Sequence, residues 1–385
     1  MSRVEWETGF SFEILAEDPH SQARLGRLTT PHGVIHTPAF MPVGTYGAVK
    51  GISPDELICS GAEIILANAL HLEFRPGSET VKNLGGLHRL MGWAGPILTD
   101  SGGFQTYSLS RLTRQNDQGI EVRSPIDGSK HQLTPEKVIE IQRRLGSDIM
   151  MPLDLCAPGA SDREVSEKAM MQTVEWAERS RAAFDRSDPE HGFQQALFGI
   201  VQGGVHEDLR KIAIESLLQI GLYGYAIGGL AVGESKEDTW RIINFCNALL
   251  PENRLRYVMG IGTPEDLQIA ISLGVDLFDC ALPTRNGRKG SLFIKEGKIN
   301  LRNAAFKNDS RPIAEGCPCS ACHVQDGGHS KFSRGAVRHL LISGDPLGAR
   351  LGALHNLTFF LQHLAQIRAD IEKRATSEAG NVVVR

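Results

Sequence analysis

Residues 276–290 read Asp-Leu-Phe-Asp-Cys-Ala-Leu-Pro-Thr-Arg-Asn-Gly-Arg-Lys-Gly, and the rest of the chain can be interpreted outward from this stretch. Its apolar half, Leu277–Leu282, predicts a short buried strand that ends at Pro283 in a turn. A carboxylate inside such a run is costly to bury without a partner. Asp279 therefore has either a hydrogen-bonding partner or a chemical role. A structural Asp that caps the strand is the simpler alternative.

The predicted turn is basic, because it carries Arg285, Arg288 and Lys289. An anionic substrate attracted to these cations would lie against Asp279 at the end of the strand. The basic character continues, since residues 285–311 hold eight Lys and Arg residues and only two acidic residues. Such a run is often only a solvated face, but its position next to Asp279 favours contacts with phosphate groups.

Short β-rich runs recur along the chain, and segments with helical patterning separate them. The eight predicted strands are Thr37–Val43, Glu63–Ala67, Pro96–Thr99, Asp148–Leu153, Ala196–Val201, Gly224–Ile227, Arg256–Gly260 and Asp276–Leu282. The predicted helices include Pro135–Leu145, Arg163–Arg186 and Thr239–Leu249. Eight strands that alternate with helices over roughly 250 residues predict an α/β fold of the (β/α)8 TIM-barrel type. A doubly wound open sheet is the alternative, but no G-x-G-x-x-G motif follows the first strand.

Polar side chains lie at the ends of four predicted strands. Asp100 and Asp154 follow the third and fourth strands. Gln202 follows the fifth strand, and Asp279 lies in the eighth. In a TIM barrel the C-terminal ends of all strands meet at one face, where the active site is built. We therefore expect these four side chains to face one another across one opening.

Composition limits the class of protein. The chain has 385 residues, of which 41% are hydrophobic and 22% charged, as in ordinary globular proteins of one large or two smaller domains. A net charge of -4 means that any nucleic-acid-binding surface is a local patch. Residues 1–10 lack the apolar core of a signal peptide, and no apolar run approaches the length of a membrane span. We therefore expect a cytoplasmic protein.

Three of the seven cysteines fall within six residues, in the segment Cys317-Pro318-Cys319-Ser320-Ala321-Cys322. Metal ligation in a reducing compartment explains this spacing better than a disulfide framework does. Three thiolates and one imidazole form a closed tetrahedral site, so the expected metal is a structural Zn2+. Spacing alone leaves the fourth ligand open among His323, His329, His339 and His355.

The predicted elements divide the chain into four parts. These are an N-terminal lead-in (1–36), a catalytic barrel (37–285), a zinc-binding subdomain (286–375) and a tail expected to be disordered (376–385). The lead-in contains a hairpin that turns at Pro31-His32-Gly33. The subdomain closes with an amphipathic helix over residues 356–373.

Several longer motifs closely resemble the bacterial tRNA-guanine transglycosylases, of the queuine tRNA-ribosyltransferase family, over nearly the whole chain. The motifs that carry the resemblance are Thr37–Gly44 (TPAFMPVG), Thr99–Gln105 (TDSGGFQ), Phe198–Gly203 (FGIVQG), Gly228–Glu234 (GGLAVGE), Phe278–Gly290 and the three-cysteine cluster. The resemblance implies a (β/α)8 barrel with a zinc-bearing insertion near its C-terminal end. It also implies exchange of the wobble guanine, in tRNAs with G-U-N anticodons, for the queuosine precursor preQ1 (7-aminomethyl-7-deazaguanine).

The same resemblance implies a role for each site residue. Asp279 corresponds to the nucleophile that attacks the ribose anomeric carbon, expels guanine and forms a covalent intermediate. Asp100 corresponds to a second carboxylate, the general acid/base that also contacts the ribose. Two carboxylates act by the same two-step logic in retaining glycosidases. The residues that correspond to base-binding groups are Asp154, Gln202, Gly229 and Leu230 along the base edge, Phe104 and Met259 on its two faces, and Cys156 and Val232 around its substituent.

The remaining implied residues bind RNA and metal. Arg285, Arg288 and Lys289 correspond to the segment that holds the nucleotides flanking the wobble base. His355, which precedes an asparagine, corresponds to the fourth zinc ligand. The family also implies a homodimer whose contact lies near Val324–Lys331, a segment that looks like an insertion.

The chain departs from the family pattern beside the implied base site. Asp154-Leu155-Cys156-Ala157-Pro158 stands where Asp-Glu-Cys-Thr-Pro is common, and Asn68-Ala69-Leu70-His71-Leu72 stands for Asn-Thr-Tyr-His-Leu. The missing glutamate bears on nucleotide contacts and on base preference. Cys156 and Val232 keep the bulk found in preQ1-using enzymes, so we expect preQ1 as the substrate ahead of queuine.

Three alternatives remain at this point. The archaeal branch of the family modifies the tRNA D-loop and carries a further RNA-binding domain, for which this chain has no room. A non-catalytic tRNA-binding subunit would typically lose the carboxylates, whereas Asp100 and Asp279 are both present. An unrelated phosphate-binding barrel enzyme could use Gly228-Gly229 as an anion site, but it leaves the cysteine cluster unexplained.

Overall fold

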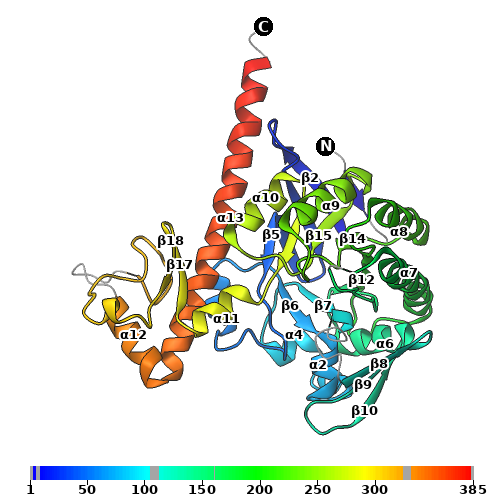
Figure 1. The fold of residues 1–385 in the computed structure, drawn as a ribbon, viewed down its shortest axis with the longest axis horizontal. Helices are drawn as coiled ribbons and strands as arrows, with labels where there is room; N and C mark the ends of the chain where they lie inside the picture. Colours follow the sequence, from blue (N-terminus) through cyan, green and yellow to red (C-terminus); the bar gives the residue numbers. More distant parts are fainter. Residues whose placement is uncertain (1–2, 6–8, 105–111, 160, 324–330, 383–385) are drawn as a thin grey trace.

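The protein is an α/β structure in which helices surround short parallel strands, with a lobe at one side and a long C-terminal helix that projects beyond the body (Figure 1). The computed structural model describes residues 3–5, 9–104, 112–159, 161–323 and 331–382. In the part of the chain that it covers, no helix is both long and apolar enough to cross a membrane.

The parallel strands form two sheets. The strands are β5 (Ala39–Met41), β6 (Ile65–Asn68), β7 (Ile97–Asp100), β11 (Ile149–Met150), β12 (Ala196–Leu197), β13 (Gly199–Val201), β14 (Gly224–Ile227), β15 (Leu255–Val258) and β16 (Leu277–Asp279). One sheet has the order β12-β11-β7-β6, and the other has the order β13-β14-β15-β16-β5. All neighbouring strands within these two sheets are parallel.

Two contacts join the edges of these sheets. Val43, which follows β5, forms a parallel bridge with Leu66 of β6. Only Phe198 separates β12 from β13, and its backbone N–H donates to the carbonyl of Met150 in β11 at 3.0 Å. The strands therefore follow one another in space in the order in which they occur in the chain.

Helices separate the successive strands. They are α1 (Pro54–Cys59), α2 (Ala69–Phe74), α3 (Ser78–Asn83), α4 (Leu87–Met91), α6 (Pro135–Leu145), α7 (Arg163–Arg186), α8 (Glu207–Ile220), α9 (Lys236–Leu249) and α10 (Pro264–Ser272). Helix α6 begins where the Thr134 side chain caps the first turn, and it ends at Gly146 with φ 70°. The bounds predicted for α6 and α7 are confirmed, and α9 begins three residues before its predicted start.

An antiparallel sheet covers the end at which the parallel strands begin. Its strands are β1 (Arg3–Glu5), β2 (Ser11–Glu17), β3 (Arg24–Thr30) and β4 (Gly33–Thr37). The chain turns between β3 and β4 at Pro31 and His32, which confirms the predicted hairpin. Phe12 and Ile35 of this sheet share one buried apolar cluster with Tyr257 of β15, so the sheet packs on the parallel strands.

Two predictions of local structure are wrong. The segment after Asp279 is not a turn, because Leu282–Arg288 form helix α11, with Pro283 in its first turn, where proline is favourable. The last helix, α13, spans Pro346–Val382, so it continues through most of the segment expected to be a disordered tail. A three-stranded antiparallel sheet was also not predicted: β8 (Thr113–Asn116), β9 (Gly119–Arg123) and β10 (Lys130–Leu133).

The lobe follows α11 and lies beside the main body (Figure 1). It contains β17 (Ser291–Ile294), β18 (Gly297–Asn300), a 3-10 helix (Ala304–Phe306) and α12 (Arg334–Ser343). Asn356 of α13 joins these elements, because its side chain bonds the backbone of Pro283, Ser291 and Phe293. The amide of Asn356 thus fixes α13 against both α11 and the lobe.

Candidate active site and metal centre

The four polar residues predicted at strand ends line one cavity of about 350 Å³. Asp100 ends β7 and Asp279 ends β16, whereas Asp154 and Gln202 lie just beyond β11 and β13. The convergence expected from the sequence is therefore present. Phe104 and Met259, the implied contacts to the two faces of the base, also line this cavity. Gln105, the last residue of the motif Thr99–Gln105, lies outside the described residues.

Asp279 has the partner that its apolar surroundings require. Its Oδ1 accepts hydrogen bonds from the Tyr257 hydroxyl at 2.6 Å and from the Gly260 backbone N–H at 2.9 Å. Burial raises the pKa of Asp279, and these two hydrogen bonds oppose the rise without cancelling it. Both donors reach the same oxygen, so Oδ2 carries neither of these bonds.

Asp100 lies at the end of the strand next to β6. Its Oδ2 accepts a hydrogen bond from the Asn68 side chain at 2.7 Å, and its buried Oδ1 has no hydrogen-bond partner among the described residues. Burial raises the pKa of Asp100 to about 7 against the Asn68 hydrogen bond, and the charges of Asp279 and Asp154 add to the rise. A carboxyl group with such a pKa can donate or accept a proton near neutral pH.

Asp154 and Gln202 form a hydrogen-bonded pair in the cavity wall. The Gln202 Nε2 donates to Asp154 Oδ2 at 2.9 Å, and burial raises the pKa of Asp154 to about 6 against this bond. Glycines frame the pair closely: a Cβ on Gly103 would overlap the Asp154 carboxylate, and one on Gly229 would overlap Gln202 Oε1. The pair therefore offers carbonyl and carboxylate oxygens along a narrow, rigid edge.

The other implied base-binding residues also line the cavity. They are Phe104, Cys156, Leu230, Val232 and Met259. Burial raises the pKa of the Cys156 thiol to about 12, so this group is a neutral wall and not a nucleophile.

Hydrogen bonds to the Glu234 side chain stabilise the loop that carries Leu230 and Val232. The Glu234 carboxylate accepts hydrogen bonds from the backbone N–H groups of Ala231 and Val232 and from the Thr239 hydroxyl. Ala231 has φ 57°, which an alanine rarely adopts. Glu234 thus stabilises a strained loop at the cavity wall.

Three residues that orient the side chains of the site were not predicted from the sequence. Tyr257 and Asn68 bond the two carboxylates, and Glu234 holds the loop at 230–232. Tyr257 could have been found, because a strand places residues 257 and 259 on one face and Asp279 required a donor. Asn68 and Glu234 occur in the quoted motifs, but spacing does not show which partner each would bond.

The implied RNA-binding residues lie on and next to α11. Arg285 and Lys289 are exposed, and Arg288 is partly buried. Burial and the neighbouring charge of Arg285 lower the pKa of Arg288. The short helix that carries Arg285 and Arg288 begins directly after Ala281, which lines the cavity.

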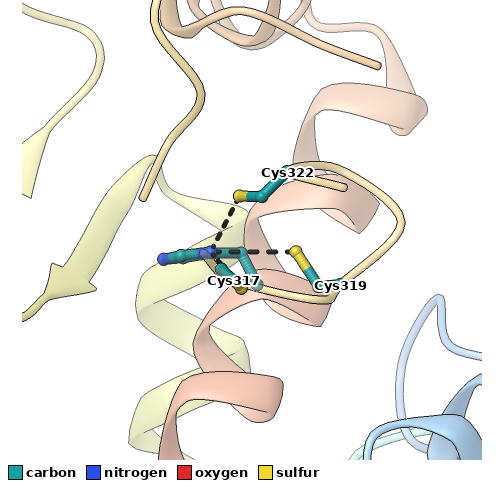
Figure 2. Close-up of side chains that lie close together, drawn as sticks. Cys317, Cys319 and Cys322 are labelled. Atoms are coloured by element: carbon teal, nitrogen blue, oxygen red, sulfur yellow. Dashed lines mark hydrogen bonds between the residues drawn. The ribbon is translucent and has the colours of Figure 1, made fainter. Parts of the chain in front are cut away.

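The three clustered cysteines surround one histidine, as Figure 2 shows. The sulfur atoms of Cys317, Cys319 and Cys322 lie 3.6, 3.8 and 3.4 Å from Nδ1 of His355. A tetrahedral zinc with ordinary bond lengths would give an S···N separation of about 3.5 Å. These four residues therefore fit a tetrahedral metal ion.

A second interaction orients the histidine ligand. The Nε2 of His355 lies 2.8 Å from the carbonyl of Phe293, so Nε2–H donates there and Nδ1 is left with its lone pair. Among the described residues, His323 and His339 are not part of the cluster, and His329 lies outside them. The structure thus brings together the ligand set that the resemblance implied.

Comparison with known proteins identifies the family of this chain. A family model described as Queuine tRNA-ribosyltransferase matches residues 18–383. The chain is 50% identical over 351 residues to a queuine tRNA-ribosyltransferase of Solidesulfovibrio magneticus, covering 91% of each chain. It is 49% identical over 361 residues to that of Nitrosomonas eutropha, covering 94% of this chain and 96% of the relative. The chain belongs to the queuine tRNA-ribosyltransferase family.

Proposed function

We propose that this protein is a tRNA-guanine transglycosylase, which exchanges the wobble guanine of tRNAs with G-U-N anticodons for preQ1. The observation that carries the proposal is one cavity in which Asp100 and Asp279 both have raised pKa values and share a wall with the Asp154–Gln202 pair. A ribosyl transfer needs both a nucleophile and a proton donor. A base exchange also needs a rigid polar edge that reads the base.

In the first step, Oδ2 of Asp279 attacks C1′ of the ribose and displaces guanine. The new bond is the C1′–Oδ2 ester, the bond that breaks is C1′–N9, and the electron pair leaves with guanine. Asp100 is protonated often enough near neutral pH to give its proton to the departing base. The donors Tyr257 and Gly260 hold Oδ1, so the attacking oxygen stays directed at the substrate.

In the second step, preQ1 replaces guanine in the same cavity. Its N9 loses a proton to Asp100 and attacks C1′, and the ester bond to Asp279 breaks to restore the carboxylate. The covalent intermediate keeps the tRNA attached while one base leaves and the next enters. The wobble nucleotide lies in an unpaired loop, so its extrusion costs less than flipping a paired base.

Base recognition follows from the shape and polarity of the wall. Phe104 and Met259 would contact the two faces of the base. Asp154 and Gln202 would bond its edge, with the backbone at Gly229 and Leu230. The basic residues Arg285, Arg288 and Lys289 would hold the phosphates of flanking nucleotides.

The site rests on a closed barrel in this proposal. Eight parallel strand segments would form one barrel if β12 and β13 are counted as one interrupted strand. The bridge between Val43 and Leu66 and the bond from Phe198 to Met150 support this closure. Residues 37–285 would then be the catalytic barrel, and residues 286–375 the zinc-binding subdomain.

The metal in this subdomain would be a structural Zn2+. Cys317, Cys319, Cys322 and His355 would fill all four tetrahedral positions, so no position is left for a substrate. We also propose a cytoplasmic homodimer. The dimer contact expected near Val324–Lys331 falls almost entirely outside the described residues.

Removal of the metal tests the structural role. Cys319→Ser should lower the bound zinc from about one ion per chain and destabilise the protein by several kcal/mol, since a structural zinc contributes folding energy. His323→Ala is the matched control, because His323 adjoins the cluster but is not part of it. Metal analysis and thermal unfolding of both variants decide the matter. Well-folded wild-type protein without zinc would contradict the assignment.

Labelled guanine tests the function directly. Purified protein should incorporate radiolabelled guanine into a tRNA with a G-U-N anticodon, and preQ1 should displace the label. A tRNA with another wobble base is the control. No incorporation into any G-U-N tRNA would favour the alternative of a non-catalytic tRNA-binding subunit. Faster displacement by queuine than by preQ1 would instead favour a queuine-salvaging enzyme.

A further inference from the structure

The rim of the cavity carries an exposed aromatic ring that the proposed reaction does not use. Tyr46 directly follows Thr45, which lines the cavity, and Tyr46 is 53% exposed. Its ring centroid lies 5.0 Å from that of His71, another cavity-lining residue, at an interplanar angle of 55°. The Tyr46 ring is therefore supported by the protein and still open to a partner.

The support beneath Tyr46 is fixed and uncharged. The backbone N–H of His71 donates to the Asn68 side chain at 2.8 Å, and the His71 ring packs edge-on against Phe74 at 6.4 Å. Phe74 in turn contacts His131 of β10. Burial lowers the pKa of His71, so its imidazole is neutral. Because the Tyr46 ring packs against a neutral imidazole, it favours a flat aromatic partner over a phosphate group.

We propose that Tyr46 is the stacking platform for the unpaired nucleobase next to the exchanged guanosine, an inference that rests on the proposed function. When the wobble base enters the cavity, its neighbours in the loop must lie at the rim. Stacking on an aromatic side chain holds such a base whatever its sequence, because every base has a π-face. The proposal adds a contact to the nucleobase, whereas the basic residues on α11 would contact phosphates.

The platform is connected to the reacting groups. Asn68 accepts from the backbone of His71 through Oδ1 and donates to Asp100 through Nδ2 at 2.7 Å. One short segment therefore carries both the support of Tyr46 and the partner of the general acid. A base stacked on Tyr46 would therefore lie next to the segment that also holds Asp100.

Exchange kinetics test the platform with an anticodon stem-loop RNA. Tyr46→Ala should raise the KM for RNA by about 5- to 150-fold, the range expected for loss of one base–aromatic stack. Its kcat should stay within about twofold, because the covalent steps do not use the ring. Tyr46→Phe keeps the ring and should restore the KM. Leu84→Ala is the matched control, because Leu84 is also 53% exposed but follows α3 outside the cavity.

A binding assay separates this proposal from the proposed function. Stem-loops with 2-aminopurine on the 5′ or the 3′ side of the exchanged guanosine should lose fluorescence at one of these positions when wild-type protein binds. Tyr46→Ala should abolish that loss. Binding and quenching without any guanine exchange would support the platform and contradict the enzymatic proposal. Normal exchange by Tyr46→Ala at unchanged KM, or a Tyr46→Phe variant as impaired as Tyr46→Ala, would overturn the platform.

Discussion

Carboxylates at the two ends of the parallel strands have opposite surroundings. Asp148 precedes β11, and it bonds His32 at 2.7 Å, His88 at 3.2 Å and the backbone N–H of Ile97 at 2.8 Å. Burial alone would raise the pKa of Asp148, but the bonds with the two histidines outweigh it and lower the pKa. Asp100, at the opposite ends of the strands, has one side-chain donor and a pKa raised to about 7.

Asp276 and Asp279 show the same contrast within one short segment. Asp276 precedes β16 and is fully buried, with Arg24 bonding both of its oxygens at 2.9 and 2.6 Å. Asp279 ends β16, opens to the cavity and bonds only neutral donors. Charged partners make a buried carboxylate structural, whereas neutral partners leave it available for proton transfer and attack.

The strongest test of this contrast replaces the carboxylate at the cavity. Asp279→Asn should lower guanine exchange by at least about 10³-fold, because it removes a nucleophile without changing the volume of the side chain. Folding and tRNA binding should be retained. A denaturing gel should show a covalent protein–RNA adduct for wild type and none for the variant. Wild-type turnover by Asp279→Asn would remove Asp279 from the mechanism.

The matched change at the other end of the same strand should affect stability instead. Asp276→Asn leaves Arg24 buried without its charged partner, which should cost about 3–5 kcal/mol of unfolding free energy. The kcat of the folded fraction should remain close to that of wild type. Denaturant unfolding and exchange kinetics at low temperature measure the two quantities. If Asp276→Asn instead lowers kcat strongly and leaves the stability unchanged, Asp276 is not the structural carboxylate that the contrast with Asp279 implies.

The contributions of Asp100 and Asp148 to the free energy of unfolding should change with pH in opposite directions, because these residues lie at opposite ends of the parallel strands and their pKa values are shifted in opposite directions. The folded-state pKa of Asp100 is raised from 3.8 to about 7, so its stabilising contribution is complete below pH 4 and is lost as the pH rises to about 7. The pKa of Asp148 is lowered, so its contribution is present above pH 4 and is lost on acidification.

Asparagine variants at both positions measure these contributions. Between pH 4 and pH 7, Asp100→Asn should gain stability relative to wild type, on the order of 1 kcal/mol for each unit of pKa shift. Asp148→Asn should be destabilised most at neutral pH and least in acid. The free energy of unfolding of wild type and of both variants should be measured over this pH range. If the two variants differ from wild type in the same way at every pH, the contrast between the two ends is wrong.

The smallest expected effect concerns the shape of the cavity and not its charge. Cys156 and Val232 both line the cavity. In the proposed mode of binding they would leave little space beside the aminomethyl group of preQ1, and the bulkier substituent of queuine would press on Val232. Overpacking of this kind costs roughly 1–3 kcal/mol, and about 1.4 kcal/mol within this range corresponds to a tenfold ratio, so we expect preQ1 to be used at least about tenfold more efficiently than queuine. Val232→Gly should reduce the difference in efficiency between preQ1 and queuine, because it removes the side chain that queuine would contact. Competition kinetics that show equal use of both bases would instead point to the altered loop at residues 155–157.

The carboxylates that line the cavity could be predicted from the sequence. A carboxylate at the end of an apolar strand is anomalous by itself, so Asp100, Asp154 and Asp279 could be singled out. Tyr257 could be named from the sequence only as a candidate donor for Asp279, because the bond itself depends on the pairing of β15 with β16. Strand register is set by three-dimensional packing and by turns, and spacing along the chain does not reveal it.

Helix α11 was predicted as a turn for a related reason. Pro283 and Gly287 are ordinary turn signals, but a Cβ on Gly287 would overlap the backbone of Gly352 in α13. The glycine is therefore needed for close packing of two helices that lie far apart in the sequence. The histidine that completes the metal cluster was left open by spacing for the same reason, since His355 approaches the cysteines only through the path of α13.

The length of α13 has a mechanical consequence. The helix carries His355 at the metal centre, Arg368 on the carbonyl of Pro38 beside β5, and Arg374 on Asp18. A helix rises about 1.5 Å per residue, so one straight rod of about 28 Å separates the first of these attachments from the last. An added residue between them would turn one end by about 100° relative to the other. We therefore expect an insertion or deletion between His355 and Arg374 to disrupt the contacts at one end of the helix, whereas a substitution on its exposed face should leave the spacing of these contacts unchanged.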